Sequence, residues 1–133
     1  MQEPRLVPRQ ERFLWVPEMA KRMKRDVERF PETSLVYELN RVTSGEASLW
    51  SLDDDKKHFA ITFVTEHPGK VLRLHFVYAP SPKLYAKHHK LFMMRLARVL
   101  RCEAIETIAR RGFERTGLGL GAKHVANVYR IEV

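Results

Sequence analysis

Hydrophobic residues recur along the chain at helical spacing in the first third of the sequence. A helix is predicted from Pro17 to Phe30, because proline suits the first helical position and a residue before proline avoids the helical region. Its apolar stripe comprises Val16, Met19, Ala20, Met23, Val27 and Phe30. A second helix follows Thr33 or Ser34, either of which can cap it, and ends at Ser44-Gly45. Its apolar side comprises Leu35, Val36, Leu39 and Val42.

The pattern then changes to short segments rich in β-branched and aromatic residues, which is typical of strands. Three such segments follow one another: Ala47–Leu52, His58–Glu66 and Val71–Ala79. The turn residues Asp53–Asp55 and His67–Lys70 separate them, so we expect an antiparallel meander. Adjacent aspartates at a hairpin tip are typical of a solvated turn, and we expect no metal site there.

A long two-sided helix is predicted from Pro82 to Arg101. Its apolar face comprises Tyr85, His89, Phe92, Met93, Leu96, Val99 and Leu100. A cationic stripe lies within about 80° on another side and comprises Lys83, Lys87, Lys90, Arg98 and Arg101. This stripe is the best candidate for a binding surface, although a lysine-rich face also serves solubility alone.

The remaining segments complete an α+β / α/β pattern. Ala104–Ala109 is short and apolar, which favours a buried strand that pairs in parallel with Val71–Ala79 through the long helix. A short helix is predicted at Arg110–Arg115 and a final alternating strand at Val125–Val133. We therefore expect a single domain over residues 16–133, with a mixed central sheet flanked by helices, preceded by an extended arm over residues 1–15 that includes a short strand at Arg5–Val7.

Composition and charge narrow the functional classes. The chain has 133 residues, a net charge of +8 and a pI of about 9.9, a balance that favours anionic partners such as nucleic acid, phosphorylated cofactors or acidic proteins. The single cysteine, Cys102, excludes an intrachain disulfide and suits a small buried side chain. No signal peptide or membrane span is visible, so we expect a cytosolic protein or a component of a particle assembled there.

Three groups of residues give this order of elements a family likeness. The first is Glu38-Leu39 with Ser44-Gly45-Glu46-Ala47-Ser48-Leu49-Trp50, and the second is Leu96-Ala97-Arg98 with Cys102-Glu103-Ala104-Ile105-Glu106. The third is Arg110-Arg111-Gly112-Phe113-Glu114-Arg115 with Leu120-Gly121-Ala122-Lys123 and Tyr129-Arg130. In order and spacing, over about residues 13–133, the chain resembles the GNAT acetyltransferase superfamily, and in particular small GNAT-like proteins encoded by tailed bacteriophages.

The resemblance implies a cofactor loop at the start of the long helix. In GNAT enzymes this loop has the pattern Arg/Gln-x-x-Gly-x-Gly/Ala, and its amides hold the pyrophosphate of acetyl-CoA. Aligned on Leu91-Phe92, the pattern places Lys83 at the arginine, Ala86 at the first key glycine and His88 at the second. Lys87 adds a cation, whereas Leu84 and His88 add bulk where glycine is expected. The resemblance thus implies a degenerate loop, with Lys83, Ala86, Lys87 and His88 as cofactor-binding residues if the protein is active.

The chain also lacks a catalytic group that many members of the family use. Many members take the proton donor from a tyrosine after the fifth strand, but Phe113–Leu120 contains no tyrosine. Tyr78, Tyr85 and Tyr129 lie elsewhere, and the possible bases are Glu66, His75 and Glu106. We assign none of them a catalytic role from the sequence.

Three functions remain open at this stage. The first is a non-catalytic structural or binding component of a virion or its assembly, located in the host cytoplasm or the virion and in contact with other assembly proteins. The second is an active N-acetyltransferase that uses acetyl-CoA, and the third is a DNA-binding protein that uses the basic surface. The seam between the strands Val71–Ala79 and Ala104–Ala109 separates the first two: a closed seam favours the non-catalytic function and a splayed one favours the enzyme.

Overall fold

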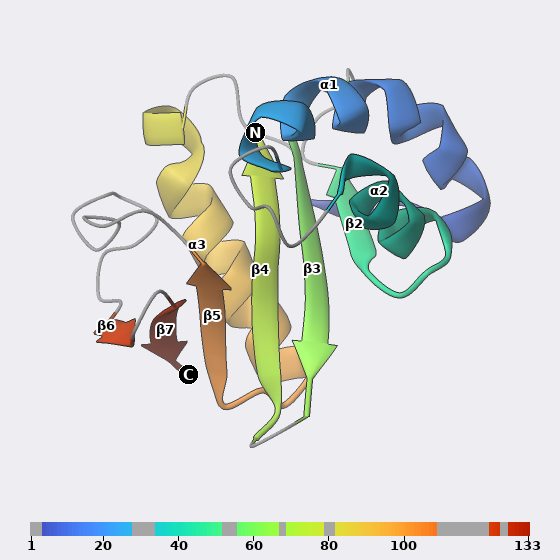
Figure 1. Ribbon diagram of the computed structural model, residues 1–133. Helices are drawn as coiled ribbons and strands as arrows, with labels where there is room; N and C mark the ends of the chain where they lie inside the picture. Colours follow the sequence, from blue (N-terminus) through green and yellow to red (C-terminus); the bar gives the residue numbers. More distant parts are fainter. Residues whose placement is uncertain are drawn as a thin grey trace. The chain divides into compact units, whose positions relative to one another are not determined.

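A computed structural model describes most of the chain, namely residues 4–27, 34–51, 56–66, 69–78, 82–108, 123–125 and 128–133. The helices are η1 (Arg9–Trp15, a 3-10 helix), α1 (Val16–Val27), α2 (Leu35–Thr43) and α3 (Pro82–Val99). The strands are β1 (Arg5–Leu6), β2 (Ser48–Ser51), β3 (Phe59–Thr65), β4 (Val71–Tyr78), β5 (Ala104–Ile108), β6 (Lys123–Val125) and β7 (Val128–Glu132) (Figure 1).

The strands form one mixed sheet in the order β1-β2-β3-β4-β5-β7-β6. β4 and β5 pair in parallel, whereas β1–β2, β2–β3, β5–β7 and β6–β7 pair antiparallel. The predicted mixed sheet with a parallel strand-helix-strand unit is therefore confirmed. None of the helices in the described ranges combines the length and apolar character that a membrane span needs.

The chain divides into two compact units. The first contains Met1–Thr62 and Phe76–Pro80, and the second contains Phe63–His75 and Ser81–Val133. β3 and β4 each contribute residues to both units. Each unit is described separately below.

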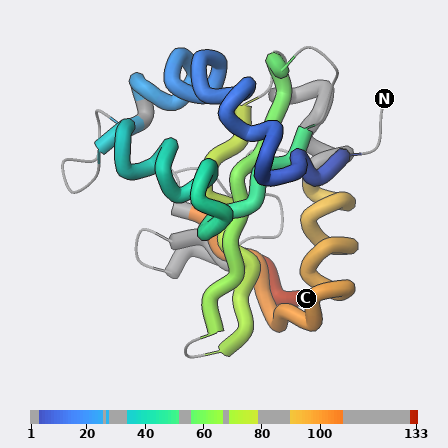
Figure 2. The backbone as a smooth tube through the Cα atoms, turned by 90° about the vertical axis from the view of Figure 1, so that its right-hand side faces the viewer, coloured from blue at the N-terminus to red at the C-terminus, as the bar shows by residue number. Residues whose placement is uncertain are grey.

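The first unit has a core between α1, α2 and the sheet. α1 and α2 lie side by side (Figure 2), as their apolar stripes predict. Met19, Met23 and Val42 are buried, together with Leu49 on β2 and Phe59 on β3. Burial of these side chains from both helices and two strands supplies the main apolar stabilisation of this unit.

Trp15, at the end of η1, joins this core and closes it from the N-terminal side. Its ring meets the ring of Phe59 edge-on, with the centroids 6.1 Å apart. The residues 9–15 that precede α1, expected to be extended, instead form η1. Short-range hydrogen bonds of a 3-10 helix let this segment turn and bring Trp15 inward.

Two arginines of η1 attach the N-terminal segment to the end of α2. The Arg12 side chain is 6% exposed. Its Nε donates to the Val7 carbonyl at 3.1 Å, and its Nη1 donates to the Val42 and Ala47 carbonyls at 2.9 and 2.8 Å. Arg9 Nε donates to the Thr43 carbonyl at 3.4 Å. These cations meet the negative end of the α2 dipole, where carbonyls lack helical partners.

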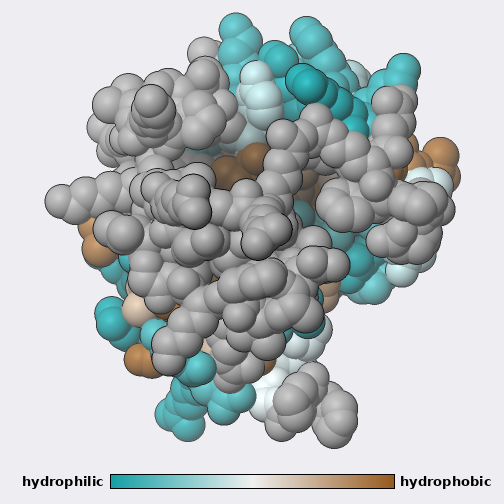
Figure 3. Space-filling model, turned by 60° about the vertical axis from the view of Figure 1, so that its left-hand side comes forward, coloured by the Kyte–Doolittle hydropathy of each residue, from teal (hydrophilic) through white to brown (hydrophobic). Residues whose placement is uncertain are grey.

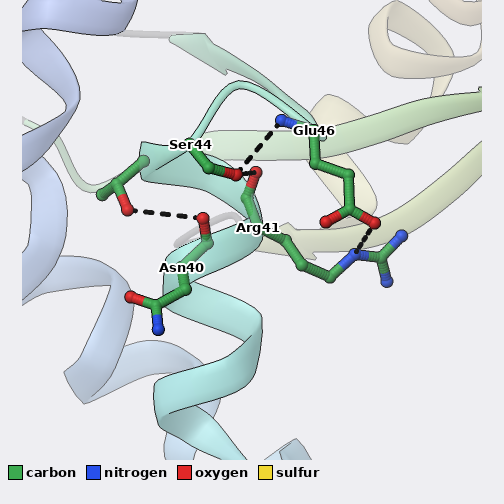
Figure 4. A network of polar contacts seen from close by, with 5 residues as sticks. Asn40, Arg41, Ser44 and Glu46 are labelled. Atoms are coloured by element: carbon green, nitrogen blue, oxygen red, sulfur yellow. Dashed lines mark hydrogen bonds and ion pairs between the residues drawn. The ribbon is translucent and has the colours of Figure 1, made fainter.

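The ends of α2 follow the predicted caps. The Ser34 side chain accepts a hydrogen bond from the Tyr37 amide at 3.1 Å, and Gly45 has a φ of +89°, which glycine adopts without a steric penalty. After the helix, Ser44 Oγ bonds the Arg41 carbonyl and accepts from the Glu46 amide, while Arg41 and Glu46 form an ion pair at 3.3 Å (Figure 4). The turn into β2 is thus fixed by local polar contacts.

The second unit packs α3 against β5. Leu72, Leu74, Met93, Ala97 and Ile105 are buried in it, and α3 lies against one face of β5 (Figure 1).

The turn after α3 is held by backbone bonds at both sides. The Cys102 amide donates to the Ala97 carbonyl at 2.7 Å, and the Glu103 amide donates to the Lys70 carbonyl at 2.8 Å. Cys102 itself is buried, as predicted.

Three further sequence expectations are corrected by the structure. Val36 and Val99 were assigned to apolar helix faces, but they are 69% and 73% exposed. The predicted final strand Val125–Val133 is instead a hairpin, in which Val125 ends β6 and pairs with Val128 at the start of β7.

Other exposed apolar side chains lie on η1 (Phe13 and Leu14) and on α3 (Leu91). Figure 3 shows small brown apolar areas beside teal polar ones on the face that it draws.

Several predictions concern residues outside the described ranges. They are the aspartate turn Asp53–Asp55, the turn residues His67-Pro68, the last residues of the first helix and the helix at Arg110–Arg115. The assignment of residues 1–15 to an arm separate from one domain stays a prediction.

Candidate functional site

The parallel strands β4 and β5 pair over only part of their length. Cα partners join Val71 to Ala104, Leu72 to Ile105 and Arg73 to Glu106. β4 continues to Tyr78 and β5 to Ile108, but within the described residues no further pair joins them. β5 keeps its antiparallel partner β7 to its last residue, Ile108.

A side chain replaces the backbone partner where this ladder ends. Thr107 Oγ1 donates to the carbonyl of Leu74 at 2.8 Å. A buried carbonyl without a donor is costly, so this bond satisfies the first β4 carbonyl beyond the paired region. The hydroxyl therefore marks the point at which the seam begins to open.

Ring contacts join β3 and β4 in each unit. In the second unit, Phe63 packs against His75, with ring centroids 5.5 Å apart. In the first unit, Phe59 packs against Phe76 and Tyr78, with centroids 5.7 and 6.1 Å apart. His75 therefore has an aromatic neighbour on β3 beside the end of the β4–β5 ladder.

The last paired residues also form an ion pair. Arg73 Nη2 lies 3.3 Å from Glu106 Oε1, and both side chains are largely buried. Arg73 therefore holds the Glu106 carboxylate at the last paired position of the ladder.

The other two candidate bases lie apart from this pair. His75 is exposed and follows Leu74 directly, so it lies where the strands part. Glu66 is exposed and follows the end of β3. Of the three possible bases, Glu106 lies at the last paired position of the β4–β5 ladder and His75 lies just beyond it.

α3 begins at Pro82, shortly after β4 ends, as the long helix was predicted to do. The predicted cofactor-binding residues Lys83, Ala86, Lys87 and His88 all fall in its first two turns, where the backbone is helical. Their side chains lie outside the described part of the structure. The free amides of a helix N-terminus attract anions, although Pro82 contributes none.

The rest of the predicted cationic stripe is only partly on the surface. Arg98 and Arg101 are exposed, whereas Lys90 is half-buried. Arg101 follows the helix with a φ of 58°, so it no longer continues the helical row. The sequence prediction omitted Arg95, which is also exposed. Its spacing from Leu91 and Arg98 places it on the same helix face.

Tyr78 lies at the end of β4 in the first unit, where α1 contacts it. The Arg22 guanidinium carbon is 4.6 Å from the centroid of the Tyr78 ring, and Arg22 pairs with Glu18 at 3.6 Å. This cation–π contact fixes the ring orientation. The side chains of Tyr85 and Tyr129 lie outside the described residues. No group of three or more metal-binding side chains occurs among the residues that the structure describes.

Comparison with solved structures gives a consistent result. A GNAT-family acetyltransferase from Listeria monocytogenes aligns with a TM-score of 0.60 and 12% identity, over 98% of this chain and 94% of that chain. A protein from Clostridium acetobutylicum, named a predicted acetyltransferase and solved with acetyl-CoA, aligns with a TM-score of 0.58 and 16% identity, over 84% and 82%. A third, named a probable acetyltransferase, aligns with a TM-score of 0.63 and 15% identity, over 84% and 81%.

Sequence comparison adds no family assignment. No protein-family model matches the chain, and no curated protein matches it. At identities of 12 to 16% the structural likeness concerns the fold. The order of elements and the mixed sheet with parallel β4 and β5 agree with that likeness. The chain therefore has the fold of the GNAT acetyltransferases.

Proposed function

We propose that this protein binds acetyl-CoA at the end of the parallel β4–β5 ladder, next to Leu74 and Thr107, and transfers the acetyl group to an amine. The observation that carries the proposal is the end of the parallel ladder at Arg73–Glu106, although both strands continue. Among the described residues, no Cα pair joins β4 to β5 beyond this point, so the ladder leaves an edge there. The amide-containing arm of coenzyme A carries donors and acceptors that suit such an edge.

The phosphates of the cofactor would lie at the start of α3. Lys83 and Lys87 supply positive charge there, and the helix amides supply donors. The loop departs from the GNAT pattern because Ala86 and His88 stand where glycines are expected. We therefore expect weaker binding than a glycine loop gives, with charge replacing part of the close backbone contact.

The transfer itself needs few groups. The lone pair of the amine attacks the thioester carbonyl carbon, a C–N bond forms, and the C–S bond breaks with release of the thiolate. The amine gives up a proton to a base, and the thiolate takes up a proton. His75 is the best-placed base, since it is exposed next to the opening while Glu106 is held by Arg73.

A non-catalytic function is the second candidate, and the loop favours it. With Lys83, Ala86 and His88 in place of Arg, Gly and Gly, the fold would serve as a binding module. A place in a bacteriophage particle or its assembly rests on the sequence resemblance alone. Under this alternative the protein binds no acetyl-CoA and transfers no acetyl group.

Calorimetric titration with acetyl-CoA separates the two candidates. We expect saturable binding that is lost or weakened at least about tenfold in Lys83→Ala, because a phosphate loses its cation. Lys24→Ala, which removes an exposed lysine of α1, is the matched control and should bind normally. No binding by the natural chain, or equal loss in both variants, would contradict the proposal.

A transfer assay with a panel of primary amines then tests the chemistry. His75→Gln should lower the rate without weakening acetyl-CoA binding, and raising the pH should partly restore the rate as the amine loses its proton unaided. Binding without transfer to any amine would support the non-catalytic alternative.

A further inference from the structure

α3 has an unusual charge distribution for a helix of an ordinary soluble domain. Between Pro82 and Val99 it carries lysine or arginine at 83, 87, 90, 95 and 98, and no aspartate or glutamate. Surface helices commonly intersperse both signs at i,i+4 spacing, which stabilises them. A cation in the first turn, as at Lys83, also opposes the helix dipole. The helix therefore presents positive charge that its own carboxylates do not balance.

The exposed face of α3 also carries aliphatic side chains. Leu91 is 60% exposed and Val99 is 73% exposed. They are eight residues apart, which is about 12 Å along a helix axis. Arg95 and Arg98 lie between them and are exposed, while Met93 and Ala97 on the opposite side are buried. Leu91, Arg95, Arg98 and Val99 follow i, i+4, i+7, i+8 spacing and form one strip, the α3 outer face.

We propose that the α3 outer face docks an acidic amphipathic helix of a partner protein. Arginine binds carboxylates in a two-point geometry, and it is enriched together with apolar residues at protein interfaces. A partner helix with carboxylates flanking an apolar row would pair its acids with Arg95 and Arg98. The same row would cover Leu91 and Val99, the two apolar anchors at the ends of the strip.

The composition of this face favours a protein over the other anionic partners. Nucleic acid is held mainly through its phosphates, and exposed leucine and valine contribute nothing to such contacts. A helix that lies on a membrane needs a broad apolar face with aromatic residues. The described part of the α3 outer face has two separated aliphatic side chains and two arginines. This composition matches the narrow strip along which two helices pack in a helix–helix contact.

The test uses a synthetic three-heptad peptide with leucine along one face and glutamate on both flanks. Fluorescence anisotropy should show saturable binding that weakens with salt. Leu91→Ser/Val99→Ser should weaken it at least about tenfold, as loss of two interface anchors does. Arg95→Gln/Arg98→Gln should weaken it as much and should also flatten the salt dependence.

A control double variant replaces two similarly exposed aliphatic side chains that lie outside α3. Leu14 on η1 is 55% exposed and Val36 on α2 is 69% exposed, so Leu14→Ser/Val36→Ser should bind the peptide like the natural chain. No binding of the peptide at millimolar concentration would overturn the proposal, and so would equal loss in the control double variant.

Competition experiments identify the partner class. If duplex DNA or phosphatidylserine vesicles displace the peptide, and their own binding depends on the arginines but not on Leu91 and Val99, the partner is nucleic acid or membrane and the proposal fails. Acetyl-CoA titration of the same variants should be unchanged. Failure of peptide binding is thus distinguishable from failure of the proposed enzymatic function.

Discussion

Arg12 is the residue whose role depends most on tertiary structure. Burial lowers the pKa of its guanidinium, and the neighbouring charge of Arg9 adds to this effect. Its acceptors include the carbonyls of Val42 and Ala47, which lie 30 and 35 residues later in the chain. Local sequence therefore shows only a polar residue before a helix. The burial of Arg12 follows from carbonyls that the end of α2 leaves free.

Replacing Arg12 by methionine should destabilise the protein by about 3 kcal/mol, because several buried carbonyls lose their donor and each costs about 1 kcal/mol or more. Arg9→Met is the matched control. Arg9 is exposed and makes one long hydrogen bond, so its loss should cost less than about 1 kcal/mol. Urea unfolding measures both. An equal loss of unfolding free energy in both variants would show that the hydrogen bonds of Arg12 add no more stability than the single bond of Arg9.

Helical spacing predicts which residues can share a face, but not how far the neighbouring elements cover it. Met19 and Met23 were assigned to the apolar stripe of α1 and are buried. Val36 and Val99 fit their stripes equally well, yet they lie at the exposed margin, beyond the packed part of each helix. Coverage depends on neighbours that the local pattern does not reveal.

At the scale of elements, the parallel partnership of β4 and β5 was predictable and its extent was not. A short apolar strand after a long helix favours parallel pairing with the strand before the helix. The end of pairing at Arg73–Glu106 depends on hydrogen-bond geometry, which hydropathy does not encode. The split of the last strand into β6 and β7 was likewise missed, because alternation continues through both strands and residues 126–127 carry no strong turn signal.

In the candidate site, too, the sequence predicts the elements but not the hydrogen bonds between them. Lys83, Ala86, Lys87 and His88 lie in the first two turns of a helix whose start was predicted at Pro82, whereas their role in holding a cofactor stays a prediction. Thr107 was missed, since a threonine in a strand is ordinary by composition. Its role appears only when its hydroxyl is seen to donate to Leu74 across the seam.

Thr107→Val tests whether this hydroxyl holds the end of the ladder. Valine keeps the branched shape but leaves the Leu74 carbonyl without its donor, so we expect a loss of about 1 kcal/mol in unfolding free energy. Thr107→Ser keeps the hydroxyl and should lose less. Thermal or urea unfolding of the three proteins is the measurement. A valine variant as stable as the natural chain would mean that water replaces the hydroxyl at no cost.

At the scale of the whole molecule, two compact units share two strands. β3 contributes Phe59–Thr62 to the first unit and its remaining residues to the second. β4 contributes Val71–His75 to the second unit and Phe76–Tyr78 to the first. Unfolding of either unit therefore removes support from strands that continue into the other. This continuity predicts one cooperative transition rather than two.

The chain carries natural reporters for each unit. Both tryptophans, Trp15 and Trp50, belong to the first unit, and the single cysteine, Cys102, belongs to the second. Burial raises the pKa of the Cys102 thiol, and the charge of Lys70 opposes this only in part. At pH 8 the native thiol is therefore covered and protonated, whereas an unfolded thiol, with a pKa of about 8.5, reacts readily.

Tryptophan fluorescence and pulsed alkylation of Cys102 should consequently report the same urea midpoint, because loss of β3 and β4 from one unit dismantles the other. Acetyl-CoA at about 100 times its dissociation constant should shift both midpoints together, corresponding to about 2.7 kcal/mol of added stability. Alkylation that precedes the fluorescence change would show that the second unit opens alone. In that case the shared strands would couple the units more weakly than their continuity implies, and ligand would protect Cys102 without moving the tryptophan transition.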